Sequence, residues 1–291
     1  MFQIIENKIH FVEAPERGRF PYAHSLFIDD DVRVLIDTAC GQNNIDYFLD
    51  HKIDVIINSH FHEDHIMNNH QFSQADIWAH ALDAPAIRSE EVFADYYGFQ
   101  YFNEVKMGKM FFDWTGAKCS PVHREISHGQ ILDFGKTKMQ VLHTPGHTPG
   151  HCCFLMEDGI LFISDIDLSS FGPWYGHLCS DLDDYIQSIK YCIEVNPSLI
   201  ISSHRGIIKD DIPGRLHNFL NIIYQKEERL LSSLKQPMTL DELTQLIIFH
   251  GPIKDFNRLY RLWEKMAIFI HLKRLLALGE VKQVDDYYYL K

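Results

Sequence analysis

The sequence lacks the features of a secreted or membrane-spanning protein. Its six cysteines form no Cys-x-x-Cys pair and are too sparse for a disulfide scaffold, a pattern typical of reduced thiols. No apolar run approaches the roughly 18 residues that a membrane span needs. Residues 1–10 also contain no apolar core of a secretory signal. We therefore expect a cytoplasmic protein without a membrane partner.

Positive charge is also scarce. The chain has 27 Lys and Arg against 40 Asp and Glu, a net charge of −13, which argues against a general nucleic-acid or anionic-membrane binder. Residues 1–212 carry a net −16, whereas residues 213–291 carry +3. The length of 291 residues and the 46% hydrophobic content predict one large domain, 1–212, and one smaller domain, 213–291.

Residues 1–212 alternate strand-like apolar runs with turns and helices, which predicts an α/β domain. The predicted strands lie at 3–5, 9–12, 24–28, 32–36, 55–58, 131–134, 139–143, 152–156, 160–164 and 199–202, and the predicted helices at 44–49 and 181–195. This order of elements predicts layers of sheet with helices outside.

Residues 83–125 interrupt this alternation with an aromatic-rich segment. Nine Phe, Tyr and Trp residues fall between Phe93 and Trp114. One interpretation is a helical hairpin that packs on the core. The other is a lid or an apolar substrate wall, because ligand pockets are lined mostly by apolar and aromatic side chains.

Residues 213–291 change to a helical pattern that ends in a β-hairpin. Helices are predicted at 215–234, 240–249 and 259–278, and hairpin strands at 281–284 and 287–290. Thr239 and Glu242 have the spacing of a capping box at the second helix. The order is winged-helix-like, and three roles stay open: covering the pocket, forming a homodimer, or binding RNA through a helix that carries Lys273 and Arg274.

A hexapeptide directly after the predicted strand 55–58 carries most of the chemistry. It contains the side chains His60, His62, Glu63, Asp64 and His65. Imidazole suits zinc, iron and other borderline metals, and carboxylates add oxygen ligands. His60 and His62 project to the same side because strand side chains alternate with period two. Asp64 and His65 lie past the turn, so this segment alone can supply ligands to two adjacent metals.

Three later segments supply the ligands that the hexapeptide lacks. His147 lies in a loop punctuated by Pro145 and Gly146, which fix a turn between two predicted strands. Asp165 follows the apolar run 160–163, and His204 follows the run 199–201, so both lie at strand ends. Each segment is a weak signal alone, but together with the hexapeptide they are strong.

This order of motifs resembles the metallo-β-lactamase superfamily, over roughly residues 5–210, with Asp37 in Leu35–Thr38 as a further match. The resemblance implies a four-layer αβ/βα sandwich, here α/β (α+β) with a smaller, mostly helical C-terminal domain. It implies a dinuclear site at one edge of that sandwich. By the resemblance, the first ion takes His60, His62 and His147, the second takes Asp64, His65 and His204, Asp165 bridges the two ions, and Asp37 orients the histidine loop.

The resemblance also implies a mechanism. Two divalent cations, zinc first and iron or manganese as alternatives, share a bridging hydroxide that attacks the substrate. Asp64 and Asp165 are the predicted catalytic residues, because Asp64 can accept a proton or steer the hydroxide. The bridging Asp resembles glyoxalase II and the intracellular hydrolase branches. Those branches commonly carry Gly shortly after the hexapeptide, where this chain has Ile66, Met67, Asn68 and Asn69, and the turn there is expected to differ.

The aromatic segments narrow the expected substrate. Residues 93–114 and 171–177 favour a small ester, thioester or lactone with an apolar group, and Tyr96, Tyr97, Trp174 and Tyr175 are the predicted contacts. Phosphodiester or RNA hydrolysis, with nucleic acid as a less favoured partner, is the first alternative. A metal-bearing binding or regulatory protein with low turnover is the second.

Overall fold

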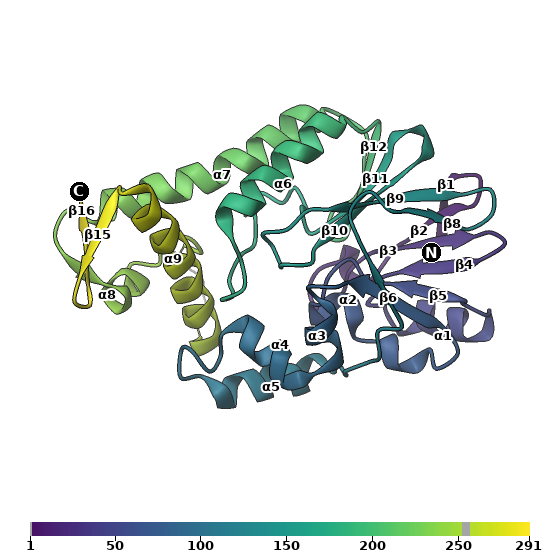
Figure 1. Cartoon of the computed structure of the whole chain (residues 1–291), viewed down its shortest axis with the longest axis horizontal. Helices are drawn as coiled ribbons and strands as arrows, with labels where there is room; N and C mark the ends of the chain where they lie inside the picture. Colours follow the sequence, from purple (N-terminus) through teal and green to yellow (C-terminus); the bar gives the residue numbers. More distant parts are fainter. Residues whose placement is uncertain (1, 252–256) are drawn as a thin grey trace.

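Two β-sheets stacked face to face form the body of the protein, and helices cover both outer faces (Figure 1). The computed structural model describes residues 2–251 and 257–291. The first sheet has seven strands in chain order: β1 (Phe2–Glu6), β2 (Ile9–Val12), β3 (Ser25–Asp29), β4 (Arg33–Ile36), β5 (Val55–Ile57), β6 (Asp76–His80) and β7 (Arg124–Ile126). It is antiparallel from β1 to β4 and parallel from β4 to β7.

The second sheet contains the strands that follow the first sheet in the sequence. Its order is β13-β12-β11-β10-β9-β8, built from β8 (Ile131–Asp133), β9 (Lys138–His143), β10 (Cys152–Met156), β11 (Ile160–Ser164), β12 (Leu199–Ser202) and β13 (Gly206–Ile208). The pair β11–β12 is parallel and α6 (Leu182–Val195) connects the two strands, whereas the other pairs are antiparallel. Their parallel carboxyl ends place the segments that follow β11 and β12 at one edge of the sheet.

Alternating side chains divide the core into three apolar layers. Between the sheets, Ile28 and Val34 of the first sheet and Phe154 and Phe162 of the second belong to one buried cluster. The outer face of the first sheet packs against α1 (Gln42–Asp50). The outer face of the second sheet packs against α6 and α7 (Ile212–Ser233). This is the four-layer αβ/βα sandwich that the resemblance implied, and central strands such as β5 and β11 are buried on both faces.

Short helices occupy the aromatic segment, which lies between β6 and β7 of the first sheet in the sequence. They are α3 (Ala84–Arg88), α4 (Glu90–Tyr97) and α5 (Val105–Thr115), while α2 (Glu63–Ile66) lies earlier, in the hexapeptide. Phe61 and Phe93 meet edge to face with ring centroids 5.6 Å apart, and Phe93 contacts Phe112 at 5.1 Å. The predicted helical hairpin therefore packs through its aromatic side chains onto the loop that carries the hexapeptide.

The C-terminal part is helical, with a small sheet at its end. It contains β14 (Met238–Thr239), α8 (Leu240–Gln245), α9 (Arg258–Leu278), β15 (Val281–Val284) and β16 (Tyr287–Leu290), and the sheet order is β14-β16-β15. The capping box of Thr239 and Glu242 is confirmed. The helix predicted to reach residue 249 ends at Gln245, because buried Glu264 of α9 accepts hydrogen bonds from the N–H groups of Phe249 and His250 in a turn. The division into two domains at residue 213 stays a prediction.

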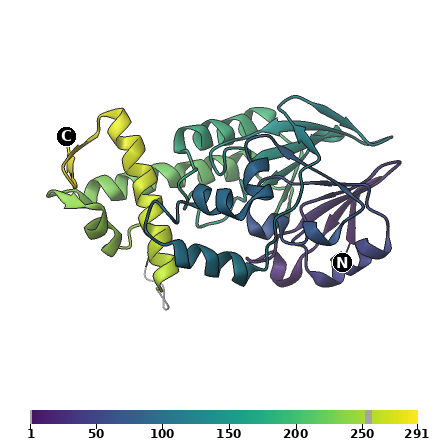
Figure 2. The ribbon, with the colours of Figure 1, turned by 60° about the horizontal axis from the view of Figure 1, so that its bottom comes forward.

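Helix α9 lies against the aromatic segment (Figures 1 and 2). Leu262 and Met266 belong to the same buried cluster as Phe111 and Phe112 of α5. Arg258 also donates to a carboxylate oxygen of Glu104 at 2.7 Å. The C-terminal part thus reaches back to the side of the sandwich that carries the hexapeptide. Across the described residues, no helix is both long and apolar enough to cross a bilayer.

Candidate metal centre

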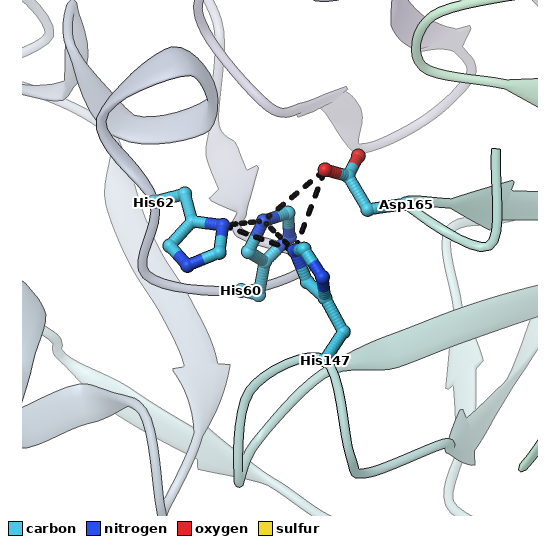
Figure 3. A group of neighbouring side chains, drawn as sticks. All are labelled: His60, His62, His147 and Asp165. Carbon is cyan, nitrogen blue, oxygen red and sulfur yellow. Dashed lines mark hydrogen bonds and ion pairs between the residues drawn. The ribbon is translucent and has the colours of Figure 1, made fainter. Parts of the chain in front are cut away.

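Three histidines from two loops bring their ring nitrogens together (Figure 3). His60 and His62 follow β5, and His147 lies in the loop between β9 and β10. Nδ1 of His62 lies 2.9 Å from Nε2 of His60 and 3.0 Å from Nε2 of His147, and the latter two atoms are 3.3 Å apart. Tetrahedral zinc with Zn–N bonds of about 2.0–2.1 Å separates its nitrogen ligands by about 3.3 Å. The triangle therefore has the size of one face of a metal site.

A second cluster of potential ligands lies beside the first. Asp64 and His65 lie in α2, and His204 follows β12. Oδ2 of Asp64 lies 3.5 Å from Nε2 of His204, and Oδ1 of Asp64 lies 3.8 Å from Nε2 of His65. The hexapeptide thus contributes to both clusters, and each cluster takes one histidine from the second sheet.

Asp165, at the end of β11, stands between the two clusters. Its Oδ2 lies 3.4 Å from Nε2 of His147 and 3.8 Å from Nε2 of His60. Its Oδ1 lies 3.1 Å from Nε2 of His65 and 3.4 Å from Nε2 of His204. Each carboxylate oxygen faces a different cluster, which is the arrangement of a bridging ligand.

The ring orientations of three histidines are fixed by acceptors on their Nδ1 side. Nδ1 of His147 lies 2.8 Å from the carbonyl oxygen of Trp174, and Nδ1 of His204 lies 2.6 Å from that of Gly18. Nδ1 of His65 lies 2.8 Å from Oδ2 of Asp37. Each ring therefore donates from Nδ1 and presents the lone pair of Nε2 to the centre, as metal ligation requires.

Two buried polar atoms at the centre indicate that these residues fit a cation. Among the described residues, no hydrogen bond satisfies Nε2 of His65 or Oδ1 of Asp165. Buried polar atoms normally have partners, and a site for an ion is one explanation for such an exception. The donor set of five imidazoles and two carboxylates suits zinc, iron or manganese, so the residues present fit divalent metal ions.

Burial disfavours the charged form of the histidines at this centre, whereas neighbouring carboxylates favour it. Burial lowers the pKa of His60 and of His62 well below the ordinary value, with help from the neighbouring histidines, so both rings are neutral ligands. Burial also acts to lower the pKa of His204, but the carboxylates of Asp165 and Asp64 outweigh it and raise that pKa to about 10. The negative electrostatic potential at His204 thus favours positive charge, which either a proton on the ring or a bound cation supplies.

Asp37, directly after β4, contacts the segment that carries the hexapeptide. Besides its contact with His65, it accepts from the backbone N–H of Ser59 at 2.8 Å and from the Ser59 hydroxyl at 2.7 Å. The Ser59 hydroxyl in turn accepts from Ser164 of β11 at 2.8 Å. This buried chain of hydrogen bonds connects the two sheets beneath the ligands.

Asp83 is a supporting residue that the sequence did not reveal. Its carboxylate accepts from the N–H of Phe61 at 3.0 Å, from Oγ1 of Thr148 at 2.7 Å and from the N–H of Gly150 at 2.6 Å. It therefore ties the hexapeptide loop to the His147 loop. Burial raises the pKa of Asp83 to about 6 against the effect of these donors. No local signal marks it, because its partners come from loops on both sides in the sequence.

The turn after the hexapeptide contains two asparagines, Asn68 and Asn69, and no glycine. Asn68 has φ −104°, so no left-handed residue is needed at this point. Its Nδ2 donates to the carbonyl oxygen of Thr38 at 2.7 Å, while Asn69 exchanges hydrogen bonds with the side chain of Asn58 at 2.9 and 3.3 Å. Side-chain amides thus stabilise this turn, which contains no glycine.

A cavity of about 740 Å³ opens over the two clusters. His62, Asp64, Asp165 and His204 line it. Aromatic side chains from several elements form much of the remaining wall, among them Phe20, Tyr97, Phe111, Trp114, Trp174, Tyr260 and Trp263. The cavity therefore combines a metal-binding floor with apolar walls, and α9 provides the wall at Tyr260 and Trp263.

Two of the four predicted substrate contacts line this cavity and two do not. Tyr97 and Trp174 line it. Tyr96 instead donates its hydroxyl to the carbonyl oxygen of Leu82 at 3.1 Å. Tyr175 is buried under α9, where its hydroxyl lies 2.8 Å from Nε2 of His271. In adjacent aromatic pairs the side chains point to different surroundings, which the sequence alone does not resolve.

Comparison with known proteins agrees with this fold. The structure of TTHA1429 from Thermus thermophilus, described as a metallo-beta-lactamase family protein, superposes with a TM-score of 0.78 at 19% identity, covering 99% of this chain and 100% of that one. The Beta-lactamase-like protein 2 homolog of Drosophila melanogaster is 23% identical over 89% of this chain and 84% of that protein. A metallo-beta-lactamase fold-containing protein of Sulfurisphaera tokodaii, ST1585, is 25% identical over 72% of this chain and 82% of its own length. Residues 18–204, which contain every ligand described above, match the family model of the Metallo-beta-lactamase superfamily, and the chain belongs to that superfamily.

Proposed function

We propose that the protein hydrolyses a small ester, thioester or lactone that carries an apolar group, with the help of two divalent metal ions. The observation that carries this proposal is the position of Asp165, whose two oxygens face separate ligand clusters on the floor of an aromatic cavity. When bound, the two ions would acidify a water molecule and polarise the carbonyl group of the substrate.

The chain offers a complete ligand set for each ion. We assign His60, His62 and His147 to one ion and Asp64, His65 and His204 to the other, with Asp165 shared. A protein of similar fold supports the number of two ions per chain. The crystal structure of TTHA1623 is described as a di-iron-bound form, and it superposes with a TM-score of 0.51 at 21% identity over 64% of this chain and 89% of that one. Zinc is our first choice of metal, with iron or manganese as alternatives.

The remaining side chains position the substrate and move protons. We assign the carboxylate of Asp64, which lines the cavity, to orient the attacking water and accept its proton. Tyr97 donates its hydroxyl to Oε2 of Glu63 at 2.7 Å, which fixes both side chains at the cavity wall. Trp174 and Trp263 pack edge to face with centroids 5.2 Å apart and provide an apolar surface that excludes water from the acyl group.

Phosphodiester or RNA hydrolysis remains the alternative, and the C-terminal part does not favour it. The guanidinium of Arg274 is hydrogen-bonded within the chain, where it donates to Glu227 and to Asp183 at 2.7 Å each. Lys273 lies 3.9 Å from Asp181. A recognition helix needs free basic side chains to contact phosphates, so RNA binding through these two residues is the weaker proposal. A metal-bearing binding protein with low turnover is the other alternative.

Metal analysis followed by a substrate panel tests the proposal. The purified protein is expected to contain about two divalent ions per chain and to hydrolyse thioester or lactone substrates faster than bis-p-nitrophenyl phosphate. Turnover of the phosphodiester alone would replace the proposed substrate class. A fully metal-loaded protein that turns over no member of the panel but retains a small molecule through purification would favour the binding protein.

A further inference from the structure

Three arginines line the cavity that contains the ligand clusters. Arg17 and Arg19 flank Gly18 in the segment before β3, and Arg205 directly follows the ligand His204. All three side chains are exposed. Within the described residues, no carboxylate lies within 4.0 Å of their guanidinium groups. The cavity therefore presents unpaired positive charge beside its aromatic walls.

Most arginines outside this cavity that the structure describes have a carboxylate partner, whereas Arg124 stacks on the ring of Trp78 and Arg229 donates to the carbonyl oxygen of Gln225. Elsewhere in the described residues, arginines reach carboxylates at 2.6–3.3 Å, namely Arg33, Arg88, Arg215, Arg258 and Arg274. The chain has 13 more acidic than basic residues, so an arginine meets a carboxylate easily. Two acidic side chains on the cavity wall are engaged elsewhere: Glu63 accepts from Tyr97, and Asp167 accepts from the N–H of Ser169 at 3.0 Å.

The backbone that carries Arg17 and Arg19 is held in an uncommon conformation. Glu16 and Arg17 have φ of 50° and 59°, and Gly18 follows with φ of 71°. Left-handed φ values at non-glycine residues cost free energy and persist where the surroundings enforce them. The carbonyl oxygen of Gly18 accepts from the ring of His204, and a Cβ at Gly18 would lie 2.8 Å from the carbonyl oxygen of Ser203. The strained turn is thus pinned against a metal ligand, with the two arginines on either side of its glycine.

We propose that Arg17, Arg19 and Arg205 form an anion-binding rim that holds a carboxylate or phosphate group of the substrate. This proposal rests on the proposed function and narrows it: the substrate has an apolar part for the aromatic wall and an anionic part for the rim. Guanidinium groups bind both oxyanions through paired N–H donors. Thioesters of a charged thiol, in which the leaving group carries the anion, have this combination.

Matched thioesters test the rim with the metal-loaded protein. The phenylacetyl thioester of 3-mercaptopropionate carries one carboxylate, and its methyl ester is the neutral counterpart. The phenylacetyl thioester of coenzyme A carries phosphates, and that of N-acetylcysteamine is its neutral counterpart. KM is expected to be lower for each charged member, and 0.5 M NaCl is expected to raise KM for the charged members alone, since salt screens exposed charges. The carboxylate and phosphate pairs distinguish the two sources of the anion.

Substituting the three rim arginines separates their effect on substrate binding from the hydrolytic step. The triple variant Arg17→Gln, Arg19→Gln, Arg205→Gln is expected to raise KM for the charged thioesters by about tenfold, to change KM for the neutral ones by less than about twofold, and to leave kcat and metal content unchanged. Arg215→Gln, an exposed arginine outside the cavity, is the matched control and should change nothing. Equal KM values for charged and neutral thioesters in the parent protein, or equal changes in both upon substitution, would overturn the rim.

A binding measurement keeps the rim testable if no thioester is hydrolysed. Trp114, Trp174 and Trp263 line the cavity, so tryptophan fluorescence reports ligand binding there. Tighter binding of coenzyme A than of N-acetylcysteamine, lost in the triple variant, would retain the rim while the proposed reaction fails. The absence of any such difference would remove the rim as well.

Discussion

Asp165 and His65 meet across the ends of the two sheets, with Oδ1 of the aspartate 3.1 Å from Nε2 of the histidine. Because the other oxygen of Asp165 faces the first cluster, removal of this carboxylate is expected to disturb both proposed ion sites at once. We expect Asp165→Ala to lose bound metal and to lower kcat roughly 10³-fold or more. Metal content by elemental analysis and initial rates, measured on the same sample, check this.

A carboxylate far from the centre provides the control for that variant. Asp133 is exposed and pairs with Lys138 at 3.7 Å on β8–β9, so Asp133→Ala should retain metal and activity. Full activity in a metal-depleted Asp165→Ala protein would contradict the assignment of Asp165 and the metal-dependent mechanism together.

Replacing Asp83 should loosen the metal site without removing a ligand. Asp83→Ala leaves the buried N–H groups of Phe61 and Gly150 without their acceptor and disconnects two ligand loops. We expect the free energy of unfolding to fall by about 2–4 kcal/mol and metal affinity to fall by about 10–100-fold. Asp83→Asn keeps one acceptor oxygen and should lose less of both. Denaturant titration and competition with a chelator measure the two effects, and unchanged metal affinity in Asp83→Ala would refute the cross-linking role.

Lys226 of α7 predicts a pH dependence of stability. Its ammonium lies 4.0 Å from the ring centroid of Phe171, and burial, together with Arg229, lowers its pKa from 10.5 to about 7. Between these values the unfolded chain binds a proton that the folded chain lacks, so the contribution of this group to stability rises with pH from about 7 to about 10. Lys226→Met should therefore be more stable than the parent protein by about 2–4 kcal/mol below pH 7, with the difference shrinking towards pH 10. Denaturation curves across this range measure it, with the exposed Lys190→Met as control, and a difference independent of pH would show that Lys226 keeps its ordinary pKa.

Arg274 and its neighbour Lys273 offer a matched test of the C-terminal helix. Arg274 is half-buried and joins α9 to Glu227 of α7 and Asp183 of α6, whereas Lys273 is exposed. Arg274→Met should lower the free energy of unfolding by about 1–3 kcal/mol, and Lys273→Met by less than about 0.5 kcal/mol. Thermal or denaturant unfolding checks the contrast. A steep, salt-sensitive loss of RNA affinity in both variants would instead restore the nucleic-acid interpretation.

The two clusters of candidate ligands could be predicted from the sequence because several of their residues follow apolar strands. Asp165 directly follows β11, and His60 and His204 come within three residues of the ends of β5 and β12; parallel strand ends meet at one edge of a sheet. The short strands β6, β7 and β13 were not predicted, since three to five residues with ordinary composition give too little periodicity. The C-terminal helix predicted at 240–249 was too long, because its end depends on Glu264, which is distant in the sequence.

Some features of the site could not be predicted from the sequence, because they depend on contacts between segments that are distant in the chain. Asp83 acts through backbone groups of two other loops, and Arg17 reaches the cavity only because its turn is pinned against His204. Tyr96 and Tyr97 are neighbours in a helix, yet only Tyr97 faces the cavity, since successive helical side chains point about 100° apart. Such assignments require the fold itself.

Helix α9 forms one wall of the cavity but supplies none of the metal ligands assigned above. The residues that we assign to the proposed reaction lie between positions 60 and 204, and Tyr260 and Trp263, which shape this wall, lie in α9. One part of the wall that contacts the substrate in our proposal thus lies in a stretch of the chain that holds none of the assigned ligands. Exchanging Tyr260 or Trp263 should change which acyl groups fit while the metals and the chemistry stay as they are, which makes α9 the natural segment for engineering a new substrate preference.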